Sequence, residues 1–318
     1  MKNKPILIVP GEIKSIFFEI FFKSLKQAKF KSPLIIISTF KILRKEMKKF
    51  NSKKNIRLLD HKKLKDYHLD NKSINLVDVN SNDRRKYSNK SNMYIQSCFD
   101  TSFSIIRSNL THKFINGPIN KYSFLNKKFL GITEYISKKF NIKKIAMLIY
   151  NKKLSVCPIT THLPIKLVSK RINKKMIIDK VTLINDFYMK VHGFRPKIAI
   201  TGLNPHCESI LKFNEDTKII EPSIKYLQKK RFKVQGPFSA DTIFLKKNRK
   251  KFNVIIGMYH DQVLAPLKTV YEYDAINITL GLPFLRVSPD HGPNKEMINK
   301  NLSNPQSLIE AIKFLDTK

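Results

Sequence analysis

Short apolar runs alternate with longer amphipathic segments along this chain. The runs are rich in β-branched residues and end at turn residues, which predicts buried strands over 5–9, 33–38, 74–79, 113–115, 144–150, 154–159, 197–203 and 254–258. Between them, apolar residues recur at helical spacing over 17–29, 43–50, 95–110, 176–191 and 217–230. This alternation of strand and helix predicts an α/β fold with a mainly parallel sheet and helices on its faces.

Three local signals refine this pattern. The polar residues 80–94 predict an exposed loop, and the closely spaced runs over 144–150 and 154–159 are candidates for adjacent strands. Asn304 and Pro305 predict the N-cap and first residue of a C-terminal helix that ends at Leu315. Since no low-complexity linker is visible, any second domain is expected to be joined by crossing strands.

Three histidines stand just past the ends of apolar runs, namely His162, His206 and His260. In an open parallel α/β sheet, ligands bind beyond the carboxyl ends of the strands. Three imidazoles at that edge would leave metal positions open for water or substrate, as catalytic metal sites do. The alternative is that each ring only hydrogen-bonds a loop. The same placement repeated three times among eight histidines favours a metal site.

The charge of the chain is unusual, because 61 lysines and arginines face 24 aspartates and glutamates, for a net charge of +37. Such a balance is typical of nucleic-acid binding. However, the lysines are spread along the whole chain, and lysine, asparagine and isoleucine are abundant together, as AT-rich codon bias would produce. We therefore expect no nucleic-acid partner, although a positive surface would steer anionic substrates towards the protein.

Cysteine usage and the N-terminus indicate a cytoplasmic protein. The three cysteines are widely spaced and form no disulfide framework, which fits a reducing compartment. Cys157 lies in a predicted strand, and Cys207 is a conceivable fourth metal ligand beside His206. The N-terminal apolar run is too short for a signal peptide, and no run reaches membrane-spanning length. Neither GxGxxG nor GxxxxGK[ST] is present, so neither the usual dinucleotide fingerprint nor a P-loop is supported.

Eight ordered motifs cover almost the whole chain: NGPINK (116–121), GITEY (131–135), TTHLP (160–164), GLNPH (202–206), GPFSADT (236–242), MYHDQ (258–262), NITLGLPF (277–284) and R-x-S-x-DHG (286–292). Together they resemble the 4-hydroxythreonine-4-phosphate dehydrogenase family, the NAD-dependent enzymes of vitamin B6 (pyridoxal phosphate) biosynthesis. Four of them, TTHLP, GLNPH, MYHDQ and NITLGLPF, are individually distinctive.

The resemblance implies a fold similar to isocitrate and isopropylmalate dehydrogenases, with two α/β domains and the active site in the cleft between them. The expected first domain is discontinuous, 1–135 plus about 275–318, and the second is about 136–274. It also implies a homodimer whose divalent metal is held by three histidines drawn from both subunits. These map onto His162, His206 and His260, which the strand-end pattern selects independently.

The resemblance further implies a phosphate-binding set made of Thr133, Lys268, Asn277 and Arg286. The planar fork of arginine fits a phosphate, and lysine supplies a point charge; a solvated surface charge is the alternative for either residue alone. Asp241 and Asp261 are candidates for proton transfer or for orienting a ligating histidine, with an N-cap as the other interpretation of Asp241. Lys268 is a further catalytic candidate, and His291 a weak candidate for a fourth ligand.

The chain departs from the family pattern at several positions. The glycine-rich N-terminal turn of the family is GEIKSIFFE (11–19) here, and the family histidine of GHTE is Ile132. Isoleucine can neither donate a hydrogen bond nor carry charge, so one substrate contact is expected to be missing. The loop after NPH also lacks the family glycine, and Val263 follows MYHDQ where the family has glycine.

The resulting hypothesis is an NAD-dependent (NADP being possible), divalent-metal-dependent oxidation of 4-phosphooxy-L-threonine to 2-amino-3-oxo-4-phosphooxybutanoate, which decarboxylates to 3-amino-2-oxopropyl phosphate. Imidazole ligands suit zinc or cobalt and, less well, magnesium. Two alternatives stay open. One is the same chemistry on another phosphorylated hydroxy acid, such as a four-carbon sugar acid phosphate, and the other is a catalytically degenerate basic binding protein.

Overall fold

The computed structural model describes residues 3–79, 91–120, 124–125, 129, 131–208, 213–289, 292 and 294–318. The chain folds into two compact units, Met1–Tyr135 with Pro283–Lys318, and Ile136–Leu282. It passes from the first to the second within helix α5 (Ile132–Lys139). Most of the predicted loop over 80–94, together with Asp290 and His291, lies outside the described residues.

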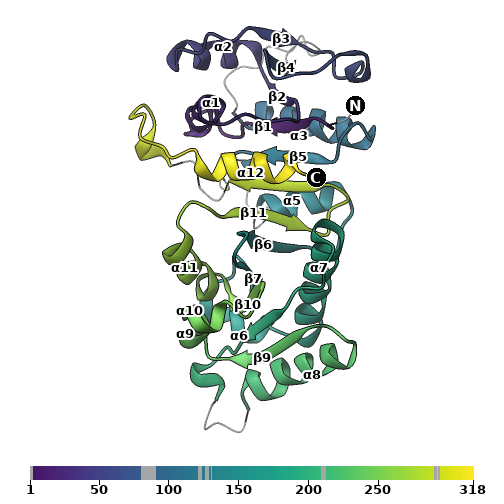
Figure 1. Cartoon of the computed structure of the whole chain (residues 1–318), viewed down its shortest axis with the longest axis vertical. Helices are drawn as coiled ribbons and strands as arrows, with labels where there is room; N and C mark the ends of the chain where they lie inside the picture. Colours follow the sequence, from purple (N-terminus) through teal and green to yellow (C-terminus); the bar gives the residue numbers. More distant parts are fainter. Residues whose placement is uncertain are drawn as a thin grey trace. The chain divides into compact units, whose positions relative to one another are not determined.

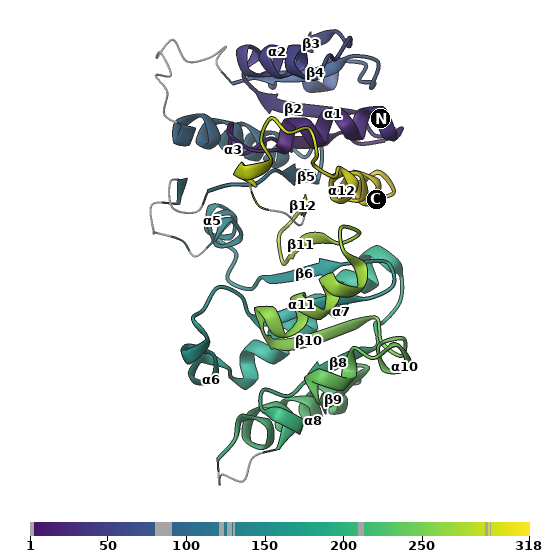
Figure 2. The same ribbon diagram turned by 90° about the vertical axis from the view of Figure 1, so that its left-hand side faces the viewer.

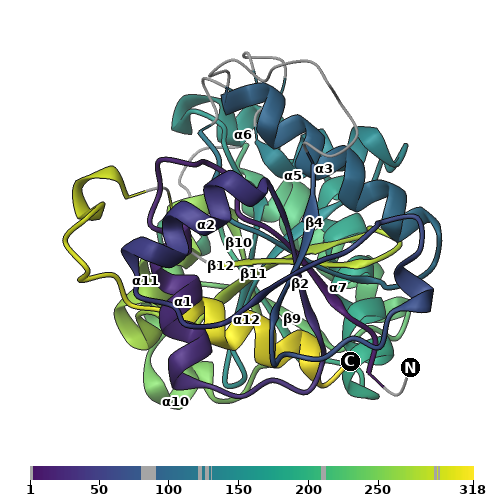
Figure 3. The ribbon, with the colours of Figure 1, turned by 90° about the horizontal axis from the view of Figure 1, so that it is seen from above.

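The first unit contains a parallel sheet with the strand order β3-β4-β2-β1-β5-β12. Its strands are β1 (Ile6–Val9), β2 (Leu34–Ser38), β3 (Ile56–Leu58), β4 (Ile74–Asp78), β5 (Lys113–Asn116) and β12 (Leu285–Pro289). Helices α1 (Phe17–Gln27) and α12 (Gln306–Asp316) pack against each other on one side of these strands, and α3 (Ser91–Arg107) lies on the other (Figure 3). Because both faces are covered, β1 and β2 are buried along their whole length, and all of their residues except Ser38 are apolar.

The second unit contains a mixed sheet in the order β11-β6-β7-β10-β8-β9. Its strands are β6 (Ala146–Tyr150), β7 (Ser155–Thr160), β8 (Ile198–Thr201), β9 (Val234–Phe238), β10 (Val254–Tyr259) and β11 (Ile276–Leu280). Strand β6 runs antiparallel to both of its neighbours, whereas β7, β10, β8 and β9 are parallel. These four parallel strands therefore deliver their carboxyl ends, and the loops that follow, to one edge.

Helices flank the sheet of the second unit (Figure 1). Helices α7 (Lys174–His192) and α8 (Glu221–Lys229) pack together on one side. On the other lie the short helices α9 (Ala240–Ile243) and α10 (Lys246–Arg249) and the longer α11 (His260–Tyr271), which packs against β7 and β10 (Figure 2). Ile255, Val263 and Leu267 belong to one buried cluster that joins α11 to the sheet. This packing fixes the start of α11, where His260 lies.

The strand and helix predictions are confirmed over most of their length, including the adjacent strands β6 and β7. The prediction for the last helix is wrong by one residue, because Pro305 is the N-cap and Gln306 begins the helix. Asn304 instead accepts a hydrogen bond through its Oδ1 from the backbone N–H of Gln306, at 2.9 Å. Among the described residues, no helix is long and apolar enough to cross a lipid bilayer.

Two loops interlock at the carboxyl edge of the first unit. The loop after β1 reaches Gly11, and the loop after β5 begins at Gly117; the N–H of Glu12 donates to the carbonyl of Pro118 at 2.9 Å. A Cβ on Gly11 would collide with the carbonyl oxygen of Pro118, and the φ of Gly11 is +80°. Glycine is therefore required at this position both for its backbone angle and for the close approach.

We expect Gly11→Ala to destabilise the protein by about 2–4 kcal/mol, the sum of a left-handed alanine and an overpacked contact. The matched control is Gly193→Ala, whose φ of +76° is similar but whose added Cβ would meet nothing within 4 Å. That variant should lose only about 1 kcal/mol. Urea unfolding followed by circular dichroism measures both, and equal losses would contradict the steric argument.

Candidate active site

Three histidines follow three neighbouring parallel strands of the second unit. His162 comes two residues after β7, His260 directly after β10, and His206 five residues after β8. Strand β10 lies between the other two and pairs in parallel with each of them. Adjacent strands are about 4.8 Å apart, so the three loops begin within about 10 Å of one another. This edge of the sheet is the candidate active site.

His162 and His260 form the centre of this site. Their ring centroids are 6.3 Å apart, with 34° between the ring planes. Both line a pocket of about 260 Å³ at the ends of β7 and β10. The two strand ends are also tied together, because Thr160 donates through its Oγ1 to the carbonyl of Met258 at 2.8 Å.

The ring of His260 is oriented by its neighbour. Its Nδ1 lies 2.6 Å from Oδ1 of Asp261, so a proton on Nδ1 is held by the carboxylate and Nε2 is left as the free acceptor. A carboxylate in this role is common beside metal-ligating histidines. The geometry fits the interpretation of Asp261 as an orienting group.

His206 lies in a short turn, Pro205–Cys207, with a left-handed backbone (φ 56°), and its side chain is exposed. Within the described part of this single chain, no three histidine, cysteine or carboxylate side chains are grouped closely enough to hold a metal ion. The chemistry of the donors fits a divalent ion, because two imidazoles line one pocket and a third lies in the loop after the neighbouring strand β8. Among the described residues, one chain thus brings two of the three predicted histidines together and places the third in a separate turn.

A second cluster of polar side chains lies around the buried Arg286 in the first unit. The side chain is only 1% exposed; its Nε donates to Oδ1 of Asn116 at 2.8 Å, and its Nη1 donates to Oγ1 of Thr133 at 3.0 Å. Burial lowers the pKa of Arg286 to about 10, and the charge of Glu134 opposes this shift, so the guanidinium is cationic at neutral pH. Thr133 is the second residue of α5, whose N-terminal N–H groups also favour an anion.

The remaining predicted residues are spread more widely. Lys268 lies near the end of α11 with an exposed side chain, and Asn277 lies on β11. The Oδ1 atom of Asn277 is buried and has no hydrogen-bond partner among the described residues. Asp241 is exposed in the first turn of α9, where Ser239 is the N-cap, so the N-cap interpretation of Asp241 is wrong.

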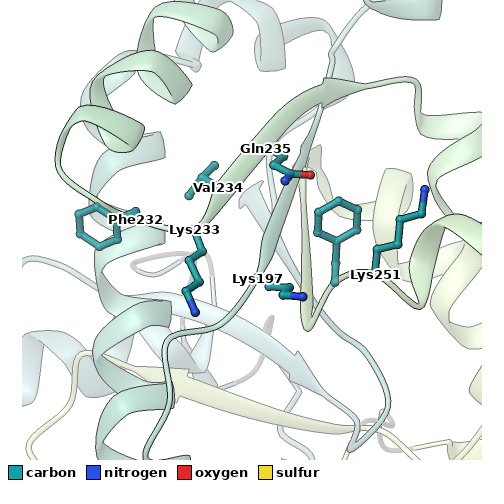
Figure 4. A pocket seen from close by; sticks show the side chains of 7 residues that line it. Lys197, Phe232, Lys233, Val234, Gln235 and Lys251 are labelled. Atoms are coloured by element: carbon teal, nitrogen blue, oxygen red, sulfur yellow. The ribbon is translucent and has the colours of Figure 1, made fainter.

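A separate pocket of about 370 Å³ lies at the opposite ends of the strands, near the starts of β8 and β9 (Figure 4). Its lining residues are Lys197, Phe232, Lys233, Val234, Gln235, Lys251 and Phe252. None of these has a side chain that titrates near neutral pH or that commonly binds a metal. This pocket therefore offers no side chain suited to acid–base or metal chemistry, in contrast to the carboxyl edge of the sheet.

Asn116 was not among the residues predicted from the sequence, although it opens the NGPINK motif. Its position directly at the end of β5, where the chain leaves a buried strand with a polar amide, is the signal that identifies it.

A profile of the family described as "Pyridoxal phosphate biosynthetic protein PdxA" matches residues 29–315. The chain belongs to the PdxA family.

Relatives and solved structures agree with membership of the PdxA family. A 4-hydroxythreonine-4-phosphate dehydrogenase of Sulfurihydrogenibium sp. (strain YO3AOP1) is 44% identical over 202 residues, which cover 62% of each chain. A D-threonate 4-phosphate dehydrogenase of Pectobacterium atrosepticum is 31% identical over 220 residues, 68% of each chain. The alignment with the first of these relatives thus spans less than two thirds of that relative's length.

Comparison of folds covers more of the PdxA-family chain. A crystal structure of 4-hydroxythreonine-4-phosphate dehydrogenase from Klebsiella pneumoniae has a TM-score of 0.84 at 26% identity, covering 98% of this chain and 97% of that one. Isocitrate dehydrogenase from Methylococcus capsulatus has a TM-score of 0.50 at 11% identity, covering 98% and 84%. The predicted α/β fold, similar to isocitrate dehydrogenase, is confirmed.

Proposed function

We propose that this PdxA-family protein oxidises 4-phosphooxy-L-threonine with NAD (NADP being the alternative) as hydride acceptor and a divalent metal as cofactor. The observation that supports this most directly is the placement of His162, His206 and His260 after three neighbouring parallel strands. A homodimer would supply the missing combination of ligands, because within the described residues one chain brings only His162 and His260 together. The cytoplasm is the proposed location, because the three cysteines are free, which fits a reducing compartment.

The phosphate of the substrate is proposed to bind at Arg286. Asn116 accepts from Nε and Thr133 accepts from Nη1, so the guanidinium is held in place from two sides. Thr133 would donate its hydroxyl to a phosphate oxygen, and the N-terminus of α5 adds a favourable dipole. Burial of the cation excludes water, and this strengthens its attraction to a phosphate.

Asn277 supports binding of a polar ligand in the second unit. A buried amide oxygen without a partner is costly unless a ligand satisfies it. The Oδ1 atom could accept from the substrate's ammonium or hydroxyl group. The exposed Lys268 is proposed to add a positive charge for the phosphate, and its catalytic role stays a prediction.

The reaction removes the proton of the substrate's C3 hydroxyl and transfers the C3 hydrogen, as hydride, to C4 of the nicotinamide. The products are NADH and 2-amino-3-oxo-4-phosphooxybutanoate, which loses its carboxyl group as CO₂ and takes up a proton to give 3-amino-2-oxopropyl phosphate. A divalent ion held by the three histidines would lower the pKa of the hydroxyl and polarise the new carbonyl. Asp261 would hold the Nδ1 side of His260 and leave its Nε2 for such an ion, and Asp241 is a candidate proton acceptor.

A second candidate substrate is D-threonate 4-phosphate, which the Pectobacterium relative is named for. It carries a hydroxyl where 4-phosphooxy-L-threonine carries an ammonium group. Ile132 keeps this possibility open, because it offers no hydrogen bond or charge at the position where the family has a histidine. Comparing kcat/KM for both phosphorylated acids in one assay decides between them, and turnover of neither would contradict the proposed function.

We expect Ile132→His to raise kcat/KM for 4-phosphooxy-L-threonine by about 5–10-fold, since one added hydrogen bond contributes about 1–1.5 kcal/mol. The increase should appear mainly in KM, because the contact is to the substrate's bound phosphate end. Ile132→Leu is the matched control and should leave KM unchanged. An unchanged KM in the histidine variant would show that position 132 does not contact the substrate.

A further inference from the structure

The turn that presents His206 has a strained backbone. His206 and Cys207 are consecutive non-glycine residues with φ angles of 56° and 62°. L-residues seldom adopt this left-handed region, and such strain persists only where the surrounding structure enforces it. The question is therefore which groups hold this turn in place.

A buried carboxylate anchors Leu203 and Asn204, which lead directly into the turn, and the N–H of Cys207 in the turn donates to the carbonyl of Asn204 at 3.1 Å. Asp216 is fully buried and accepts three hydrogen bonds, from the N–H of Leu203 (2.8 Å), the N–H of Asn204 (3.1 Å) and the side-chain amide of Asn204 (2.7 Å). Glu215 accepts from the same side-chain amide at 3.0 Å. No lysine or arginine forms an ion pair with Asp216 within the described residues. The carboxylate of Asp216 is therefore stabilised by the N–H donors of Leu203 and Asn204.

Gln262 ties the same turn to the start of α11. Its Nε2 donates to the carbonyl of Gly202 at 2.8 Å, while its Oε1 accepts from the N–H of Met258 at 2.6 Å and from Oγ1 of Thr201 at 2.9 Å. One amide thus joins the end of β8 to the end of β10, the strands that precede His206 and His260. A shift of either histidine's loop would break these bonds.

We propose that Asp216 is a positioning residue: its carboxylate fixes the strained turn so that His206 is presented to a divalent metal. Gln262 links that turn to the loop of His260. This inference rests on the proposed function, because it takes His206 as a metal ligand. Asp216 itself lies beneath the turn and touches neither imidazole in the described contacts. The hydrogen bonds to Asp216 form without a metal ion, and their proposed role is to set the position of His206 in the metal site.

The test compares Asp216→Asn with wild type in two measurements. Hydrogen exchange of the amides of Leu203 and Asn204 needs no metal and should be at least about 10-fold faster in the variant, since a lost hydrogen bond costs about 1.4 kcal/mol or more. Titration with Co²⁺, followed by its visible absorption, should show an affinity weakened by about 10–100-fold. The exposed Asp186 supplies the control, because Asp186→Asn should change neither quantity.

Milder variants keep the test informative if Asp216→Asn does not fold. Asn204→Ala leaves both backbone N–H bonds to Asp216 and should weaken Co²⁺ binding less, and Gln262→Met should weaken it without exposing the turn's own amides. Faster exchange with unchanged Co²⁺ affinity would overturn the positioning role and leave the proposed function standing. Weakened Co²⁺ binding in a protein that oxidises neither phosphorylated acid would overturn the proposed function alone. A wild-type protein that binds no Co²⁺ would overturn both.

Discussion

Replacing His260 with alanine should lower kcat/KM by at least about 10³-fold, because loss of a metal ligand removes several kcal/mol of transition-state stabilisation. His162→Ala should have a similar effect, since the two rings lie 6.3 Å apart at one pocket. Both losses should accompany weaker metal binding, measured by Co²⁺ titration of the stripped protein. Steady-state NADH formation measures the activity.

The matched control for these variants is His68→Ala, an exposed histidine in the other unit that lies outside the candidate site. It should retain wild-type activity and metal affinity. If His260→Ala kept more than about a tenth of wild-type turnover, the loss would be below the 1.4 kcal/mol of a tenfold effect. His260 would then be only a loop residue, as the simpler interpretation of these histidines holds.

Arg286→Met should reduce kcat/KM by about 10²–10⁴-fold, because truncating one partner of a buried charged contact costs about 3–5 kcal/mol. The effect should be largest with the phosphorylated substrate and should vanish for the dephosphorylated amino acid. Arg286→Lys should recover little, since a single ammonium cannot reach both Asn116 and Thr133 as the guanidinium does.

The exposed Arg195 provides the control for charge, because Arg195→Met also removes one positive charge from a chain of net charge +37. That variant should leave KM within about twofold of wild type, since a surface charge contributes little. Equal effects of the two arginine variants would mean that general steering by the basic surface, not a phosphate site, governs substrate binding.

The strands that precede the candidate site could be predicted from the sequence because each is a continuous apolar run. β7, β8 and β10 are buried along nearly their whole length, so the polar residue that follows each run stands out. Strand β9 was missed because it contains Gly236 and Pro237, which predict a turn. Proline is tolerated there because β9 lies at the end of the strand order.

The residues that hold the site in place were harder to find. Asp216 and Gln262 lie on helical segments, and their hydrogen bonds reach loops 12 to 60 residues away along the chain. No local pattern of polar and apolar positions encodes such contacts, because they depend on which strands become neighbours. Asn116 and Arg286 are likewise 170 residues apart and meet only through the pairing of β5 with β12.

The most direct test of the proposed activity is NADH formation from 4-phosphooxy-L-threonine by metal-stripped protein, before and after adding Zn²⁺, Co²⁺ or Mg²⁺, with His206→Ala as control. We predict no turnover without metal, recovery with at least one of these ions, and no recovery in the variant. Turnover that is unaffected by metal removal, or equal in the wild type and His206→Ala, would contradict the assignment of the three histidines. No turnover with any ion would contradict the proposed reaction on this substrate.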